Sequence, residues 1–107
     1  MNISAAYSMG RLTVFMSGEL DHHEARDAVR AIEELLDEYL PRECALDMSA
    51  LSFMDSSGIA VIIRVSRRMA ATGGRVWIEN PAKQALRVID ASGIERLVPI
   101  AAGGKTV

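Results

Sequence analysis

The chain has one cysteine, nearly balanced charge and no long apolar run, and each of these shortages excludes a class of protein. Cys44 cannot form an internal disulfide and lies in the apolar stretch CALDM, so we expect a cytoplasmic protein with an unreactive thiol. The net charge is -2 with both signs interspersed, which argues against nucleic acid or an anionic membrane as the main partner. No apolar run approaches the ~18 residues that cross a bilayer, and the first ten residues lack the layout of a signal peptide.

Segments with the periods of strands and helices alternate along the chain. We expect an opening hairpin with strands at residues 4–7 and 12–17, the second of them apolar enough to be buried on both faces. Two further strands are expected at 44–48 and 75–78, a loop at 49–55, and a short strand or turn in the tail. Helices are expected from a capping box at Asp21 and Glu24 to Pro41, from Ser56 to Ala71, and from Asn80-Pro81 to Ala91.

This order of elements predicts the fold class. Neither an internal repeat nor a linker interrupts the 107 residues, half of which are apolar, so we expect a single domain over residues 1–107. Strands that alternate with helices predict an α/β domain with a mixed, mostly parallel sheet that opens with an antiparallel hairpin. The helices should pack on the sheet through their apolar stripes.

The segment FMDSSGIAVI, residues 53–62, is the strongest candidate for a functional site. It joins an expected strand to an expected helix, and functional groups of α/β sheets gather outside the carboxyl ends of the strands. Free N–H groups and the helix dipole favour an anion at a helix N-terminus, so a phosphate on Ser56 or Ser57 would be tolerated there. Helical projection places Ile59, Ile62, Ile63, Val65, Ser66, Met69 and Ala70 on the buried face. It leaves Ser57, Ala60, Arg64, Arg67 and Arg68 outside as a docking face, with Ser56 near the boundary.

Other roles for these residues stay open or are disfavoured by the sequence. Asp55 or Ser56 could act only as an N-cap, and the arginines could merely complement the helix C-terminus. A catalytic serine is disfavoured because the G-x-S-x-G elbow is incomplete and no third group orients His22 or His23 as a base. Adjacent histidines also lack the i, i+4 spacing of zinc helices, and GGKT lacks the first glycine and the helix of a phosphate-binding loop. We therefore expect no enzyme activity, no metal and no cofactor.

Two motifs carry a resemblance to a known family. GELDHHEA at residues 18–25, followed by LDMSALSFMDSSGIAVI at residues 46–62, resembles the anti-sigma factor antagonists of the STAS family, in particular the sporulation-type antagonists. VWIENP and VIDASGIERLVPI fit in order and spacing, so the likeness covers nearly the whole chain. It implies a small cytoplasmic α/β domain that binds an anti-sigma factor serine kinase in its ATP- or ADP-bound form and thereby releases a sigma factor.

The resemblance also implies a phosphorylation switch and the residues that carry it. The kinase would phosphorylate Ser56, and a serine phosphatase would remove the phosphate. Asp55, Ser57 and Gly58 would line the contact surface, with Asp21 beside the phosphorylated serine as a partner-binding residue. Two alternatives remain: a phosphorylation-independent STAS adaptor or scaffold in a stress-signalling assembly, and a small enzyme that uses the DSSG loop as a phosphate cradle.

Overall fold

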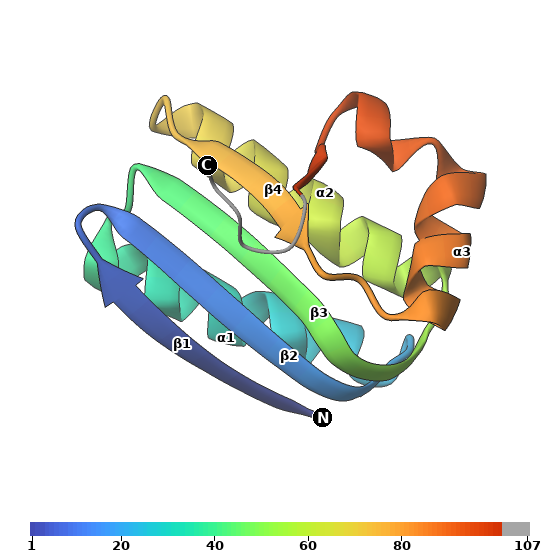
Figure 1. The fold of residues 1–107 in the computed structure, drawn as a ribbon. Coiled ribbons are helices and arrows are strands. Elements are labelled where there is room, and N and C mark those ends of the chain that lie inside the picture. Colours follow the sequence, from blue (N-terminus) through green and yellow to red (C-terminus); the bar gives the residue numbers. More distant parts are fainter. Residues whose placement is uncertain (102–107) are drawn as a thin grey trace.

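The computed structural model describes residues 1–101 and contains one five-stranded sheet (Figure 1). The strands are β1 (Asn2–Ser8), β2 (Arg11–Leu20), β3 (Glu43–Met54), β4 (Arg75–Glu79) and β5 (Ile100–Ala101), in that spatial order. β1 pairs antiparallel with β2, and every later pair is parallel, which confirms the predicted mixed sheet. The GGKT segment lies outside the described residues.

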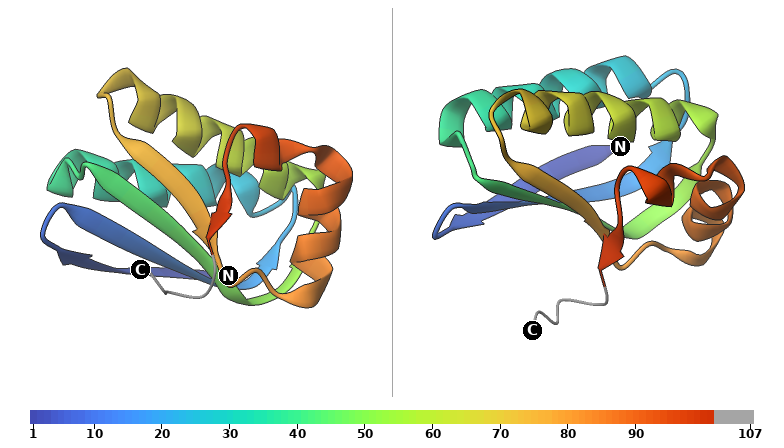
Figure 2. Two further views of the ribbon diagram at one scale, coloured as in Figure 1. Left: turned by 45° about the horizontal axis from the view of Figure 1, so that its top comes forward. Right: turned by 90° about the horizontal axis from the view of Figure 1, so that it is seen from above.

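Three α-helices pack on this sheet, as expected for the fold class. They are α1 (Ala25–Tyr39), α2 (Ser56–Ala71) and α3 (Lys83–Ser92), and a short 3-10 helix, η1 (Ile94–Arg96), precedes β5. Figure 2 shows α1 and α2 side by side over one face, whereas α3 lies at the carboxyl ends of β3 and β4. The core lies between that face and the two helices and includes Leu12, Val14, Met16, Leu46, Met48, Ile32, Leu36, Val61, Ile62 and Val65. Within residues 1–101, no helix has the length and apolar character needed to span a membrane.

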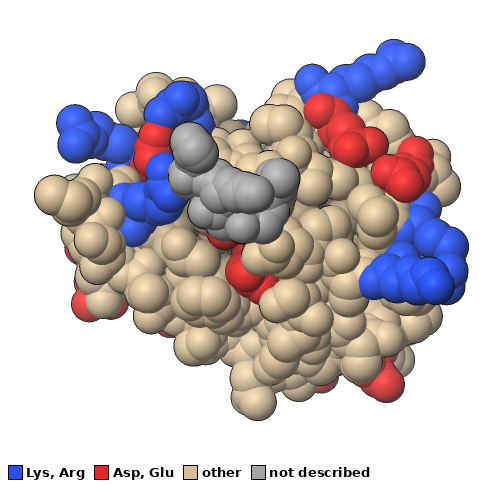
Figure 3. Space-filling view, in the orientation of Figure 1, with Lys and Arg blue, Asp and Glu red and all other residues tan. Residues whose placement is uncertain are grey.

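The opposite face of the sheet carries no helix over β1 and β2. Leu12, Val14 and Met16 of β2 are buried, but Phe15, which points the other way, is 43% exposed. The prediction that this strand is buried on both faces is therefore wrong, because α1 and α2 lie on the same side of the sheet. Figure 3 looks onto this open face, whose visible part is largely uncharged apart from acidic atoms near its centre, with the other charged side chains toward the margins.

The predicted loop at residues 49–55 is wrong, since β3 continues to Met54. Its pairing with β2 persists past two register irregularities to the pair Leu20↔Met54, because β2 also extends three residues beyond its predicted end at Ser17. The exposed serines of this stretch had the composition of a loop but lie on an extended strand. As a result, Asp55 and Ser56 follow a strand end directly.

The predicted starts of the first and third helices also need correction. A turn separates Asp21 from α1, which begins at Ala25. Asn80 has a left-handed backbone with φ 50°, and its side chain donates to Asp47 Oδ2 at 3.2 Å, so α3 begins only at Lys83. Asp21 Oδ1 still accepts from the N–H of Glu24, but that bond closes the turn before the helix, whereas the side chain of Asn80 bonds to β3 instead of to α3.

Candidate functional site

Two aspartates lie side by side where β2 and β3 end. Leu20 and Met54 are partners in the parallel ladder, and Asp21 and Asp55 directly follow them. The backbone N–H of Asp55 donates to the Leu20 carbonyl at 3.3 Å, which fixes the two strand ends to each other. Residues more than thirty positions apart in the sequence therefore meet at one edge of the sheet, as parallel strands require.

Each aspartate is oriented by backbone donors. Asp21 Oδ1 accepts from the N–H of His23 at 3.0 Å and from that of Glu24 at 3.2 Å, which stabilises the turn before α1. Asp55 is the N-cap of α2, and its Oδ1 accepts from the N–H of Ser57 at 2.8 Å. These bonds satisfy N–H groups that a helix or turn leaves without backbone partners, and they hold both carboxylates at the strand ends.

The two serines after Asp55 differ in exposure. Ser56 is the first residue of α2 and is exposed, whereas Ser57 is partly buried. Because Asp55 supplies the capping oxygen, the Ser56 hydroxyl is not required for the cap. The simpler role proposed for Ser56 from the sequence thus belongs to Asp55, and the Ser56 hydroxyl remains available to solvent.

Gly58 is buried at the base of this segment. A Cβ built on it would lie 2.2 Å from Met54 Cγ, 2.5 Å from Met54 Sδ and 3.2 Å from Leu20 Cδ2. Real carbon atoms do not approach so closely, so the glycine is required for packing of α2 against the ends of β2 and β3. Its contribution to partner contact stays a prediction.

A residue that the sequence analysis missed holds the end of β3. The Gln84 side chain on α3 accepts from the Met54 N–H at 2.8 Å and donates to the Met54 carbonyl at 2.9 Å. The amide thus bonds to Met54 much as a neighbouring strand would. The two residues are thirty positions apart, and the only sequence signal was a polar side chain in the first turn of α3.

The predicted docking face of α2 borders a groove. A hollow of about 630 Å³ lies between α1 and α2, and its lining includes Ala60, Arg64 and Arg67. Arg64 Nε pairs with Glu33 Oε2 of α1 at 3.3 Å, and Arg68 pairs with Asp37. Arg64 and Arg68 therefore link α2 to α1 through ion pairs, in addition to lying toward the C-terminus of α2. Among residues 1–101, Arg67 forms no ion pair.

The predicted buried face of α2 needs correction. Gly58 and Val61 are buried, Ile59 and Ile63 are only partly buried, and Ala70 is exposed. The helix contacts both the sheet and α1, and it is apolar around most of its circumference, so periodicity alone could not fix its orientation.

The site's surroundings offer little reactive chemistry. His22 and His23 are exposed with ring centroids 3.9 Å apart, and residues 1–101 contain no cluster of three or more side chains arranged to hold a metal. At the opposite end of β3 from the site, burial raises the pKa of the Cys44 thiol to about 12, so little thiolate forms there at neutral pH. Among these groups, the Ser56 hydroxyl is exposed at the start of α2.

Comparison with known proteins agrees with the motifs. The family profile of the STAS domain matches residues 2–104. The anti-sigma F factor antagonist of Paenibacillus polymyxa is 30% identical over 100 residues, which cover 94% of this chain and 86% of that protein. A structure of the anti-sigma factor antagonist SpoIIAA in its unphosphorylated form has a TM-score of 0.81 at 23% identity, covering 97% of this chain and 90% of that one. Phosphorylated SpoIIAA of Bacillus gives a TM-score of 0.72 at 23% identity and covers 97% and 93%. The resemblance is confirmed, and the chain belongs to the STAS domain family.

Proposed function

We propose that this protein is an anti-sigma factor antagonist in the cytoplasm. It binds an anti-sigma factor serine kinase in its ATP- or ADP-bound form and so releases a sigma factor. Phosphorylation of Ser56 switches it off, and a serine phosphatase restores it. The observation that carries the proposal is the exposed Ser56 hydroxyl at the start of α2, next to the aspartates that end β2 and β3. The name of the Paenibacillus polymyxa relative supports the same function.

A phosphate on Ser56 would change the charge of the site without requiring a change of fold. In the transfer, the terminal phosphoryl group of ATP passes to Ser56 Oγ, the hydroxyl proton goes to solvent and ADP leaves. The product carries roughly -1.5 to -2 charges at neutral pH. Asp21 and Asp55 already make this edge negative, while the N-terminus of α2 compensates part of the added charge within the protein. Repulsion therefore acts mainly against an incoming partner surface.

The contact surface continues along α2. Asp21, Asp55 and Ser57 border the phosphorylated serine, and Ala60, Arg64 and Arg67 extend the surface along the groove against α1. The small side chain of Ala60 permits close approach, and Arg67 is available to a partner carboxylate. Gly58 supports this surface from below through its packing against Met54.

Intact-mass spectrometry of the full chain tests the proposal. The protein is incubated with ATP and a candidate anti-sigma kinase, with Ser56→Ala and Ser57→Ala as a matched pair. We expect one phosphate on the parent and on Ser57→Ala, and none on Ser56→Ala. A phosphate that persists on Ser56→Ala would show that the acceptor is wrong.

Two further measurements on the same samples separate the two alternatives. A stable complex on a sizing column that forms without any phosphorylation, and regardless of ATP, would favour an adaptor or scaffold. Turnover of a phosphate compound by the isolated protein would favour a small enzyme. Either result would contradict the proposed switch.

A further inference from the structure

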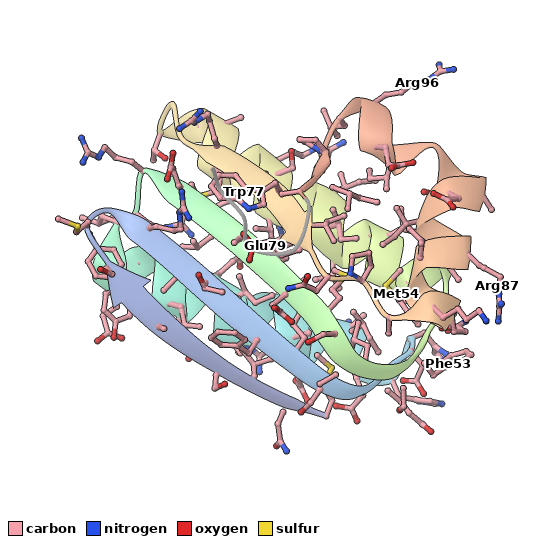
Figure 4. All side chains as sticks on the ribbon, viewed as in Figure 1. Phe53, Met54, Trp77, Glu79, Arg87 and Arg96 are labelled. Carbon is pink, nitrogen blue, oxygen red and sulfur yellow. The ribbon has the colours of Figure 1, made fainter. Side chains whose placement is uncertain are left out.

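A second hollow lies on the other side of α2 from the groove against α1. It measures about 500 Å³ and lies between the start of α2 and α3. Its apolar lining includes Ile59, Val88 and Ala91, and Ser56 and Arg87 also border it. Figure 4 shows Arg87 extending from α3 at the end of the molecule where Phe53 and Met54 lie. One hollow thus joins the candidate phosphorylated hydroxyl, a guanidinium and an apolar lining.

Arg87 is the one cation that lines this hollow. It is exposed, and it forms no ion pair within the range 1–101. Arg64 already pairs with Glu33 of α1, and Arg67 lies eleven positions beyond Ser56, about 16 Å along the helix axis. No cation on α2 itself therefore has a comparable position.

We propose that Arg87 is the intramolecular counter-ion of the phosphate on Ser56. The guanidinium binds two phosphate oxygens across the mouth of the hollow and draws the phosphate toward α3. The inference rests on the proposed function, because it describes how that function's phosphorylated form is arranged. It adds a second effect to repulsion: the paired groups cover the apolar lining, so a partner finds this surface open only when Ser56 is unmodified.

The chemistry of the two groups suits this pairing. A guanidinium presents parallel N–H donors that match two oxygens of a phosphate, and such charge-assisted bonds are stronger than neutral ones. The second observation that supports it is the rigid placement of α3, since Gln84 fixes this helix to the backbone of Met54 just before the serine segment. Ser56 and Arg87 therefore project from two elements whose spacing is set by hydrogen bonds.

A phosphorus-NMR titration of the full chain tests the pairing without any kinase. Phosphoserine is incorporated at position 56 during translation, and the pKa of the phosphate is compared between the parent background, Arg87→Gln and Lys83→Gln. Lys83 is exposed on α3, one turn before Arg87, and does not line the hollow, so its variant controls for general loss of charge. We expect Arg87→Gln to raise the phosphate pKa by about half a pH unit and Lys83→Gln to raise it much less. The difference should shrink in high salt.

A second measurement covers the case in which Arg87→Gln alters the fold. In the parent background with phosphoserine, the Arg87 side-chain N–H resonance should shift with the same midpoint as the phosphorus signal. Equal phosphate pKa values in all three proteins, or an Arg87 resonance that ignores the titration, would overturn the pairing. Because no kinase takes part, these results stand whether or not Ser56 proves to be the kinase's target.

Discussion

Substitution of Gly58 by alanine tests how the candidate site is held in place. The added Cβ would lie 2.2 Å from Met54 Cγ and 3.2 Å from Leu20 Cδ2, and both side chains are fully buried. Cγ is close to the backbone, so a rotation at the far end of the methionine does not relieve the contact. Either the Met54 side chain changes rotamer into a filled core, or α2 shifts away from the strand ends.

The expected loss follows from two opposing effects. Overpacking a filled core costs about 1–3 kcal/mol. Replacing glycine by alanine in a helix returns up to about 1 kcal/mol. We therefore expect Gly58→Ala to lower the free energy of unfolding by roughly 1–2 kcal/mol, which corresponds to a fall in Tm of several degrees for a domain of this size.

Denaturant titration of four variants checks this reasoning. Ala60→Gly, at an exposed position of the same helix, measures the propensity effect alone. Met54→Ala removes the obstructing atoms, so in the double variant the Gly58→Ala change should cost less than in the parent. A Gly58→Ala protein at least as stable as the parent, with no coupling to Met54, would refute the packing role of the glycine.

Three further predictions concern Cys44, Gln84 and Asp47. The Cys44 thiol, whose pKa burial raises to about 12, should react with a thiol reagent at pH 8 only as fast as the protein opens, and a rapid stoichiometric reaction in the native state would contradict this. Gln84→Ala leaves the Met54 N–H without its partner, so we expect a loss of about 1–3 kcal/mol in denaturation and faster hydrogen exchange at that amide, with Lys83→Ala as the neutral neighbour. Burial raises the pKa of Asp47, but hydrogen bonds from Ser49 and Asn80 outweigh it and hold the pKa below the ordinary value of 3.8. The folded state therefore favours the ionised form, and the stabilisation present above that value is lost as pH falls through the lower folded pKa. Asp47→Asn should flatten the decline in stability as pH falls below about 5, and an unchanged slope would contradict the role of this carboxylate.

The local chemistry of the sequence was enough to predict the fold class and the start of α2. Asp55-Ser56-Ser57 carries its capping signal within three residues, so the helix begins where the pattern indicated. The strand predicted for β3 is too short because its exposed serines resemble a loop. Only pairing with the extended end of β2 keeps that segment a strand. Asn80 was assigned to a helix start because its distant acceptor, Asp47, cannot be found from neighbouring residues.

The contacts that hold the candidate site cannot be predicted from the sequence for the same reason. Arg64 with Glu33, and Gln84 with Met54, join residues about thirty positions apart, and nothing in the local pattern selects those partners. The helical periodicity also assigns Gly58 to neither the buried nor the exposed face of α2. Its burial nevertheless decides how closely α2 approaches the strands.

Three contacts hold Met54, which composition alone would predict to be an ordinary core residue. Leu20 pairs with it across the sheet, Gln84 bonds to both its N–H and its carbonyl, and Gly58 leaves room for its side chain. The residue two positions later, Ser56, is exposed and takes no part in this network of packing contacts. We therefore expect that the proposed phosphate would change the surface charge while the supporting structure stays fixed. We accordingly expect hydrogen exchange at the Met54 amide to be as slow with phosphoserine at position 56 as without it, and markedly faster exchange would show that the phosphate acts by loosening the strand end.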